Sequence, residues 1–426
     1  MKYFNYTLIK NKHKRKLVWL FWVISLIMVT VNIIYYTNNV NTGRINSPEL
    51  LDVKRSELLG RAEHMIKGYD YDKAVELIKA SSELYNEEAQ ALIDSANEKK
   101  QQLVKYDGRY YHIFFHSLIL DNTLAFDDKG HPAQGYNWYM TTQSEFIKML
   151  PLLLENDFVL YDINEMVEIV NGKAIAKDIY LPPGKKPLVL SVDDVNYYEY
   201  MKPDGFADRL DVDKEGNVVT VVLDNDGNDV VTYDGDVMPI LDSFVREHPE
   251  FSFRGAKGIV AITGYEGAFG YRITDLPDYD EDEQEYMLDK VRKVSQALRA
   301  TGWQIANHSY THNSYWASTI TMEQLKYDTE RWKNDIMPYV GETNIMITPF
   351  GASFSQDDPR FRYIIEAGFY IFCPVGSDMT TSFQNDNMLQ YRLNLDGLTM
   401  IKYPERVSEY FFDPQIVLDQ DRPQIE

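Results

Sequence analysis

Two short polar strings, each directly after a run of β-forming residues, constrain this chain most. Residues 191–194 read Ser-Val-Asp-Asp and follow the apolar run 187–190. Residues 308–312 read His-Ser-Tyr-Thr-His and end the run that begins at residue 302. Ligands and catalytic groups gather at the carboxyl ends of parallel strands. Because both strings have this position, we expect their side chains to form one joint site.

The residue types in these strings suit a metal ion. Asp193 and Asp194 are adjacent at the end of a strand and point in opposite directions, so they can serve two roles. His308 and His312 are four residues apart, which predicts that both imidazoles lie on one side of a helical turn. Two neutral histidines and one carboxylate suit Zn²⁺ or a similar divalent ion. Taken singly, each string is also typical of a turn, a helix cap or a surface helix.

Both strings resemble motifs of the polysaccharide deacetylase family, also called the NodB-homology or carbohydrate esterase family 4 domain. The family's first motif is a strand ending in Thr-Phe-Asp-Asp, which residues 191–194 match with conservative changes. Its second motif, His-Ser/Thr-x-x-His, is matched in full by residues 308–312. The resemblance spans residues 108–412 and implies an α/β fold, a distorted (β/α) barrel of the NodB type.

The resemblance also implies a role for each motif residue. Asp193 would be the general base, and the metal ligands would be Asp194, His308 and His312. A divalent metal lowers the pKa of its water and polarises the carbonyl, while the base takes the proton. The family's third motif, Arg-x-Pro-Tyr-Gly, corresponds to Ile-Thr-Pro-Phe-Gly at residues 347–351. Pro349 would then contact the substrate, and the Phe350 N–H would bind the oxyanion.

Two functional groups of the family are missing from their usual places. Ile347 replaces the arginine that orients the catalytic aspartate in the family. Arg392, where another strand could end, is a candidate substitute, although an ordinary surface or ion-paired arginine is the favoured interpretation from the sequence. The family's last motif supplies a histidine as general acid, and this chain has no histidine after His312.

Three explanations remain for protonation of the leaving group. His116 follows the apolar run 113–115, so it could face the site from the end of the first strand, unless it is a structural histidine. Water at the metal could instead carry the proton, which would suffice better for an O-acetyl ester than for an amide. Alternatively, the domain binds sugars without hydrolysing them.

Aromatic residues are frequent around the second motif. Sugar rings stack their apolar faces on such side chains. We therefore predict that at least one of three aromatic residues lines a sugar subsite: Tyr310, Tyr315 and Trp316.

The amino-terminal sequence predicts a membrane anchor. Residues 17–36 form an uncharged and mostly apolar run that is long enough to span a bilayer. Residues 1–16 hold six Lys and Arg side chains and no acidic residue, which predicts a cytoplasmic tail and an extracellular remainder. A cleaved signal peptide is the main alternative, but no small-x-small cleavage pattern closes the run.

The remaining composition limits the partners. The net charge is −22 despite the basic amino terminus, so nucleic acid and anionic lipid are poor partners. The single cysteine, Cys373, excludes an internal disulfide. Four further segments are expected: a linker at 37–47, a helical stalk or TPR-like hairpin at 48–105, a β-hairpin within 208–235, and a C-terminal tail at 413–426.

Together these features predict a membrane-tethered metal-dependent hydrolase. Its expected reaction is deacetylation of a cell-surface or extracellular polysaccharide, with an N-acetylhexosamine polymer such as that of the cell wall favoured and an O-acetylated glycan second. Zinc is the expected metal, and cobalt or nickel are alternatives. The contrasting hypothesis is a non-catalytic carbohydrate-binding surface protein that retains the metal triad.

Overall fold

The computed structural model describes residues 48–355, 357–384 and 386–425. These residues form two compact units, one of residues 48–63 and 72–96 and one of residues 64–71 and 97–425. The predicted cytoplasmic tail, membrane anchor and linker at 1–16, 17–36 and 37–47 lie outside the described residues. None of the helices formed by residues 48 to 425 is both long and apolar enough to cross a membrane.

The region predicted to be a helical hairpin forms three helices. They are α2 (Pro48–Lys67), α3 (Tyr71–Ala80) and α4 (Glu87–Gln101). The smaller unit buries one stripe of each helix, which includes Leu58, Ala74 and Ile93. Apolar residues at three- and four-residue spacing bury one face of each helix and leave the charged face to solvent. The role of this unit as a stalk stays a prediction.

The larger unit is built on a curled, half-barrel sheet. Its central strands are buried on both faces, as the continuous apolar runs in the sequence predict. Most neighbours in this sheet are parallel, which requires the chain to cross over between strands. In spatial order the strands are β15 (Thr381–Gln384), β16 (Asn387–Gln390), β14 (Ile371–Cys373), β13 (Ile345–Ile347), β12 (Gln304–Asn307), β11 (Ile259–Ile262), β7 (Lys186–Val192), β2 (Tyr111–Phe115) and β17 (Leu393–Asn394), with β3 (Phe158–Leu160) also paired to β7.

The register of this sheet aligns the carboxyl ends of its strands. Phe115 of β2 pairs with Val192 of β7, and Val192 pairs with Val260 of β11. Ile262 of β11 pairs with Asn307 of β12. The residues that follow these strands therefore leave the sheet at one common edge, where ligands collect in parallel sheets.

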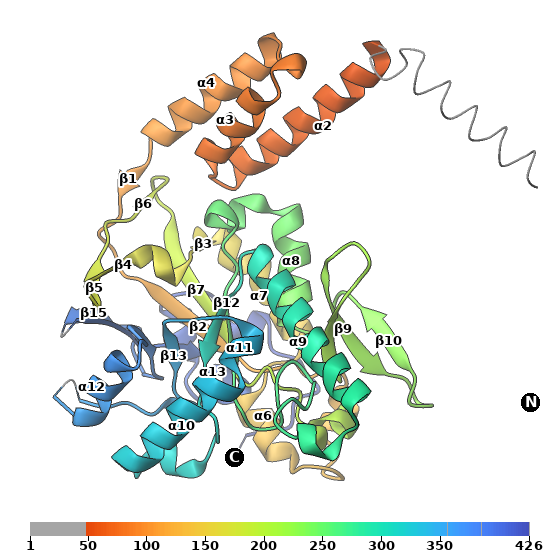
Figure 1. Cartoon of the computed structure of the whole chain (residues 1–426), viewed down its shortest axis with the longest axis vertical. Helices are drawn as coiled ribbons and strands as arrows, with labels where there is room; N and C mark the ends of the chain where they lie inside the picture. Colours follow the sequence, from red (N-terminus) through yellow and green to blue (C-terminus); the bar gives the residue numbers. More distant parts are fainter. Residues whose placement is uncertain (1–47, 356, 385, 426) are drawn as a thin grey trace, which may run out of the picture. The chain divides into compact units, whose positions relative to one another are not determined.

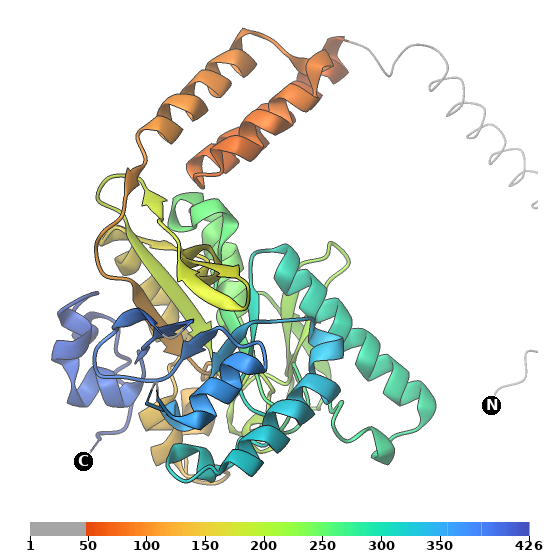
Figure 2. The same cartoon turned by 60° about the vertical axis from the view of Figure 1, so that its left-hand side comes forward.

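Helices cover the outside of the sheet. Figures 1 and 2 show α9, α10 and α12 along its outer side. The core between the layers contains large buried side chains such as Phe146, Trp303 and Trp332. The helices of this unit are α5 (Asn122–Ala125), α6 (Ala133–Tyr139), α7 (Gln143–Glu155), α8 (Val237–Glu247), α9 (Glu281–Ala300), α10 (Met322–Asp335), α11 (Met337–Val340), α12 (Pro359–Glu366), α13 (Gly397–Lys402) and α14 (Pro404–Ser408).

The hairpin predicted within residues 208–235 is confirmed. It forms a three-stranded antiparallel sheet of β8 (Arg209–Val212), β9 (Val218–Leu223) and β10 (Asp229–Thr232). Gly227 has a φ of 79° in the turn between β9 and β10, a conformation that glycine adopts without strain. Two short antiparallel pairs complete the strands: β1 (Val104–Lys105) with β6 (Tyr180–Leu181), and β4 (Val167–Val170) with β5 (Lys173–Ala176).

Residues 413–425 do not form the separate tail that the sequence predicts. The Arg422 side chain is almost completely buried, and its Nε donates to Glu145 Oε1 at 2.6 Å. The Asp419 carboxylate accepts from Thr142 Oγ1 at 2.5 Å. Both bonds hold the segment against the start of α7, where Thr142 and Glu145 form a capping box. The domain boundary predicted at residue 412 is therefore corrected.

Candidate metal centre

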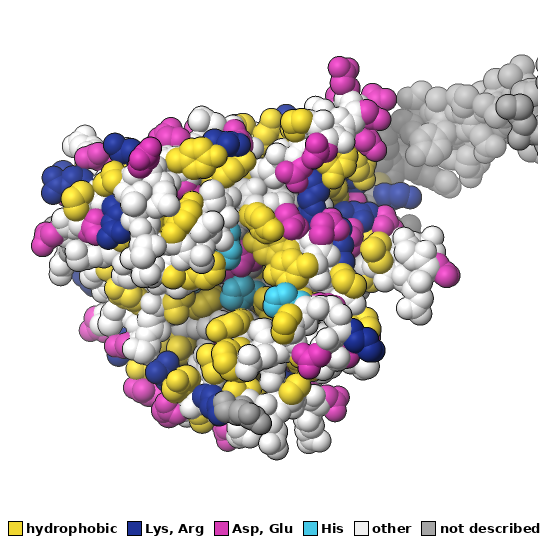
Figure 3. Space-filling view, turned by 90° about the horizontal axis from the view of Figure 1, so that it is seen from below, with side chains coloured by type: hydrophobic (Ala, Val, Ile, Leu, Met, Phe, Trp, Pro, Cys, Tyr) yellow, Lys and Arg dark blue, Asp and Glu magenta, His cyan; other side chains and the backbone are white. Residues whose placement is uncertain are grey.

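The predicted site residues meet at the common edge of the sheet. His116 follows β2, the two aspartates follow β7, and the two histidines of the second motif follow β12. Phe350 follows β13 in the one-turn helix η10 (Pro349–Gly351). Figure 3 shows histidine side chains at the surface of one face of the molecule, surrounded by hydrophobic side chains. The strand order therefore brings together motifs that are more than one hundred residues apart.

Asp194, His308 and His312 form a group with the geometry of a metal site. Asp194 Oδ1 lies 3.4 Å from His312 Nε2 and 3.7 Å from His308 Nε2. One ligand atom from each of the three residues lies within 4.8 Å of the others. Two imidazole nitrogens and a carboxylate oxygen fit a zinc-type ion and leave positions for water and substrate. The residues present therefore fit the metal that the motifs imply.

The orientation of His308 is fixed by a backbone bond. Its Nδ1 lies 2.8 Å from the carbonyl oxygen of Ile347, to which a ring N–H donates. This bond leaves Nε2 free to face Asp194, as in metal sites where the second ring nitrogen is held by a carbonyl. Burial lowers the pKa of His308, which keeps the imidazole neutral as a ligand must be. Ile347 thus supports the site through its carbonyl oxygen, although it cannot replace the family's arginine.

The charge of Asp194 is stabilised by its neighbours. Burial alone would raise its pKa, but His312, His308 and a hydrogen bond from Tyr198 outweigh burial and lower the pKa to about 2. The Tyr198 hydroxyl donates to Asp194 Oδ1 at 2.7 Å. Asp194 is therefore ionised at neutral pH, which metal binding requires. Tyr198 lies four residues after Asp194, but its bond to this carboxylate was not predicted.

The prediction that the two histidines share a helical turn is wrong. Residues 308–313 form an irregular loop, in which Ser309 and His312 have φ values of 70° and 42°. Asp328 of α10 organises this loop: its carboxylate accepts from the backbone N–H groups of Tyr310 at 2.7 Å and Thr311 at 2.9 Å. The loop therefore takes its conformation from a distant helix and not from local helical spacing.

Replacing Asp328 with asparagine is expected to weaken metal binding about 10- to 100-fold, the usual range for losing a group that orients metal ligands. Asparagine keeps one acceptor oxygen, but its amide nitrogen cannot accept, so one of the two loop N–H groups would lose its partner and the loop between His308 and His312 would be held less firmly. Competition with a chromophoric chelator measures the Zn²⁺ affinity. Glu323→Gln, an exposed position on the same helix, is the matched control. Wild-type affinity in a folded Asp328→Asn variant would contradict this expectation.

Asp193 is held differently from Asp194, as the strand geometry predicts. Arg392 binds it through two parallel bonds, from Nη1 to Oδ1 at 2.7 Å and from Nη2 to Oδ2 at 3.0 Å. The Arg392 side chain is fully buried. Burial would raise the pKa of Asp193, but Arg392 outweighs it and lowers the pKa. Asp193 Oδ2 also lies 4.0 Å from His308 Nε2, so this carboxylate faces the metal group.

A network of buried polar side chains holds Arg392 in place. Arg392 Nη1 also donates to Ser191 Oγ at 3.0 Å, and Ser191 Oγ lies 3.0 Å from His112 Nε2. His112 Nδ1 lies 2.8 Å from Gln390 Oε1. Burial and the charge of Arg392 lower the pKa of His112 well below its usual value, so His112 is neutral. Neither His112 nor Gln390 was among the predicted site residues, because neither follows a strand at the site edge.

His116 reaches the site from the end of β2. Its Nδ1 lies 3.1 Å from the carbonyl oxygen of Tyr139, and its Nε2 lies 4.0 Å from Asp194 Oδ2. The Nδ1 contact fits donation to the carbonyl, which leaves Nε2 directed at the site. His116 therefore lies at the end of the first strand with its Nε2 directed at the site, which is the placement that a proton donor needs.

The third motif forms a tight turn beside the metal group. Phe350 has a φ of 55° and a ψ of 20°, and its ring centroid lies 4.8 Å from that of His312. The ring is 54% exposed, whereas Pro349 is buried. Thr348 Oγ1 donates to the carbonyl of Ala352 at 2.6 Å and closes the turn. A buried Pro349 offers little surface to a substrate, so only Phe350 reaches the open side.

The aromatic residues predicted for sugar binding mostly support the loop. Trp316 is 1% exposed, and its Nε1 donates to Asp328 at 3.4 Å, so the prediction for Trp316 is corrected. The Tyr315 hydroxyl lies 2.8 Å from Thr311 Oγ1. The Tyr310 hydroxyl accepts from Arg331 at 2.6 Å, and its ring packs under that guanidinium. Aromatic side chains with more exposed rings lie elsewhere around the site.

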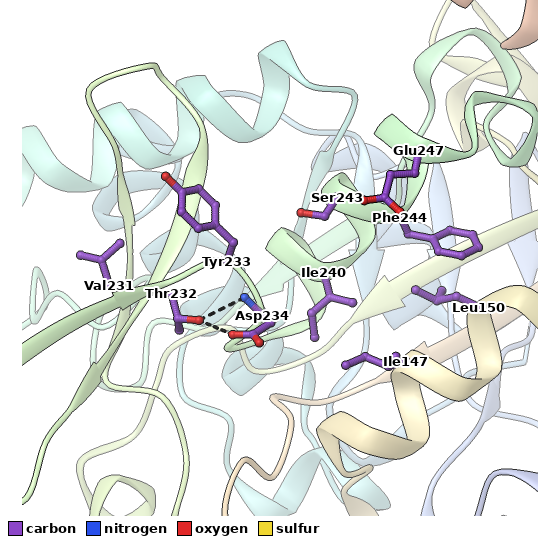
Figure 4. Close-up of a pocket in the computed structure, with 10 residues that line it drawn as sticks. All are labelled: Ile147, Leu150, Val231, Thr232, Tyr233, Asp234, Ile240, Ser243, Phe244 and Glu247. Carbon is purple, nitrogen blue, oxygen red and sulfur yellow. Dashed lines mark hydrogen bonds between the residues drawn. The ribbon is translucent and has the colours of Figure 1, made fainter.

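A separate groove of about 550 Å³ lies between α7, α8 and β10 (Figure 4). It is lined mainly by apolar side chains such as Ile147 and Val231, and Tyr233 and Glu247 lie at its border. Thr232 and Asp234 hydrogen-bond to each other within it. None of the residues that form the candidate metal centre lines this groove.

Solved structures that are similar to this chain include two deacetylases at low sequence identity. No family model and no curated protein matches the chain. A de-N-acetylase from Aggregatibacter actinomycetemcomitans is 17% identical, with 68% of this chain and 96% of that chain covered and a TM-score of 0.40. The Streptococcus pyogenes deacetylase PplD in complex with acetate is 12% identical, with coverages of 72% and 98% and a TM-score of 0.39.

Proposed function

We propose that this protein is a metal-dependent hydrolase that removes acetyl groups from a polysaccharide. The observation that carries the proposal is that two adjacent aspartates at the end of one strand have different partners. Asp194 lies among His308 and His312, while Asp193 is held by Arg392. This combination would place a metal ion and an oriented, ionised base next to each other.

The chain's own residues account for each proton and charge in such a reaction. A bound divalent metal supplies Lewis-acid chemistry, polarising the carbonyl and acidifying water. Asp193, oriented by Arg392, accepts the proton of the attacking water. The backbone N–H of Phe350 donates to the carbonyl oxygen as negative charge develops there. As an imidazolium, His116 would hold the Tyr139 carbonyl through its Nδ1–H and give its Nε2 proton to the departing nitrogen or oxygen, becoming a neutral imidazole.

Arg392 and His116 favour catalysis over the non-catalytic alternative. That alternative rested on the missing arginine and the missing acid of the family motifs. Arg392 contacts both oxygens of Asp193, and His116 Nε2 lies 4.0 Å from Asp194. An arginine and a histidine are therefore present beside the two aspartates, although they come from other positions in the chain than in the family motifs.

We further propose that the curled sheet is a distorted (β/α) barrel of the NodB type. Residues 387–394 support this proposal, because β16 pairs with β14 while β17 pairs with β2. One stretch of chain thus connects both ends of the series of parallel strands. A bridge between Val375 and Arg392 lies between these pairings.

The cellular setting is also a proposal. Residues 17–36 would anchor the chain in the cell membrane with a cytoplasmic amino terminus, and the larger unit would act outside the cell. An N-acetylhexosamine polymer such as peptidoglycan is the favoured substrate, because a tethered enzyme meets the wall first. An O-acetylated glycan such as acetylated xylan is the second candidate, and zinc is the favoured metal.

Acetate release tests this function. The full-length protein is loaded with Zn²⁺ or Co²⁺ and incubated with chitooligosaccharides, peptidoglycan or acetylated xylan. We expect the metal-loaded protein to release acetate from at least one substrate, and chelator-treated protein to release none. Bound metal without acetate release from any substrate would support the carbohydrate-binding alternative instead.

A further inference from the structure

Two loops beside the metal centre are joined into one rigid support. One follows β7 and the other follows β11. The Asn196 side chain exchanges hydrogen bonds with both backbone groups of Thr263, at 3.1 Å each. Arg272 donates to the carbonyl oxygens of Tyr197 at 2.6 Å and Glu266 at 2.6 Å. Because Asn196 and Arg272 are buried, these bonds fix the loops without help from solvent.

This support presents three tyrosine rings next to a metal ligand. Tyr198 is buried at the centre, with its hydroxyl on Asp194. Tyr200 stacks on Tyr198 with ring centroids 5.7 Å apart and an interplanar angle of 12°. Tyr265 contacts the same ring at 5.5 Å. Tyr200 is 44% exposed and Tyr265 is 49% exposed, so two rings face solvent from a fixed base.

Both exposed rings contact the same buried ring, that of Tyr198. Half-exposed aromatic rings that adjoin one another form an apolar patch, and such patches on a soluble domain mark binding surfaces. The patch is continuous with the candidate metal centre, because Tyr198 contacts both exposed rings and the Asp194 carboxylate. The Tyr198 side chain therefore links the patch directly to a residue of the candidate metal centre.

We propose that Tyr200 and Tyr265 form a subsite for a pyranose ring that neighbours the acetylated sugar. This inference rests on the proposed function and adds to it the place where a neighbouring sugar of the polysaccharide binds. The apolar face of a pyranose ring packs on an aromatic ring, whereas a free monosaccharide would leave the patch uncovered. Affinity should therefore increase with the number of sugar units.

Equilibrium binding tests the subsite. The metal-loaded full-length protein is titrated with dimeric and hexameric forms of three probes: chitooligosaccharide, acetylated xylooligosaccharide and peptidoglycan glycan strand. For the hexamer that wild type binds best, Tyr265→Ala is expected to weaken binding about 3- to 10-fold, with a smaller effect on the dimer. The double variant Tyr200→Ala, Tyr265→Ala should lose more, and Tyr265→Phe, which keeps the ring, should bind as wild type does.

Tyr233→Ala provides the matched control. Tyr233 is 48% exposed but lies at the separate groove, so its loss should leave glycan binding unchanged. Metal content and thermal unfolding confirm that each variant is folded. Hexamer binding equal to wild type in the double variant overturns the subsite, even if acetate release establishes the enzyme. Failure of wild type to bind any hexamer overturns the subsite, and failure to release acetate as well overturns the proposed function too.

Discussion

Replacing Asp193 with asparagine is expected to lower the kcat for acetate release by about 100- to 10,000-fold, the contribution typical of a positioned general base. The amide cannot take a proton from water, whereas its oxygen can still accept a bond from Arg392. Asp193 is not one of the three residues that form the metal group, so the variant should still bind metal. Acetate release and metal stoichiometry, measured on the same preparation, check both expectations.

Asp242→Asn is the matched control for this prediction. Asp242 forms a partly buried ion pair with Lys257 at 2.9 Å, and Lys257 lies before β11, away from the carboxyl ends of the strands. The same chemical change should therefore leave kcat unaltered. If Asp193→Asn retains more than about a tenth of the wild-type kcat with metal bound, the base must be another group.

The sequence predicts the strands that form the site because their signals are local. Residues 187–192 and 259–262 are mostly apolar, and residues 304–307 hold Ile305 and Ala306 between two polar residues. Each segment is a buried parallel strand. Once the strands are parallel and in register, the positions of Asp193, Asp194 and His308 follow. The α/β class and the place of these three residues at one edge of the sheet are therefore accessible without coordinates.

Features that depend on distant contacts were not predictable in the same way. The loop from His308 to His312 was expected to be helical, yet the Asp328 carboxylate imposes another conformation through long-range bonds. Similarly, Arg422 lies 277 residues from Glu145, so nothing local indicates that the C-terminal residues are part of the core. A sequence shows which groups can accept bonds, but not which donors will reach them.

Aromatic residues illustrate a further limit. Trp316 and Tyr265 both lie close to a motif or strand end, but the first is buried and the second is half exposed. Proximity in sequence to a metal ligand gives no information about this difference, because burial depends on which helix packs over the loop. Arg392 was partly predictable. Its place near a strand end made it a candidate site residue, but only the fold shows that it binds Asp193, which is 199 residues away.

Replacing Arg392 with methionine is expected to destabilise the larger unit by about 3–5 kcal/mol, the usual result of removing one partner of a buried ion pair. Methionine retains much of the side-chain volume but leaves the Asp193 carboxylate buried without its charge partner. Denaturant unfolding of metal-free protein, followed by tryptophan fluorescence, measures this loss. In protein that remains folded, kcat should also fall about 10- to 100-fold, because among the described residues Arg392 is the side chain that binds both oxygens of Asp193.

Two further variants separate charge from geometry. Lys257→Met removes the partner of Asp242 at a distance from the site, so it should lower stability without lowering kcat. Arg392→Lys restores the positive charge but not the planar fork that bonds both carboxylate oxygens. We therefore expect it to recover more of the stability than of the kcat. Wild-type stability and kcat in Arg392→Met would instead mean that Arg392 neither neutralises nor orients Asp193, and the catalytic proposal would lose its substitute for the family's arginine.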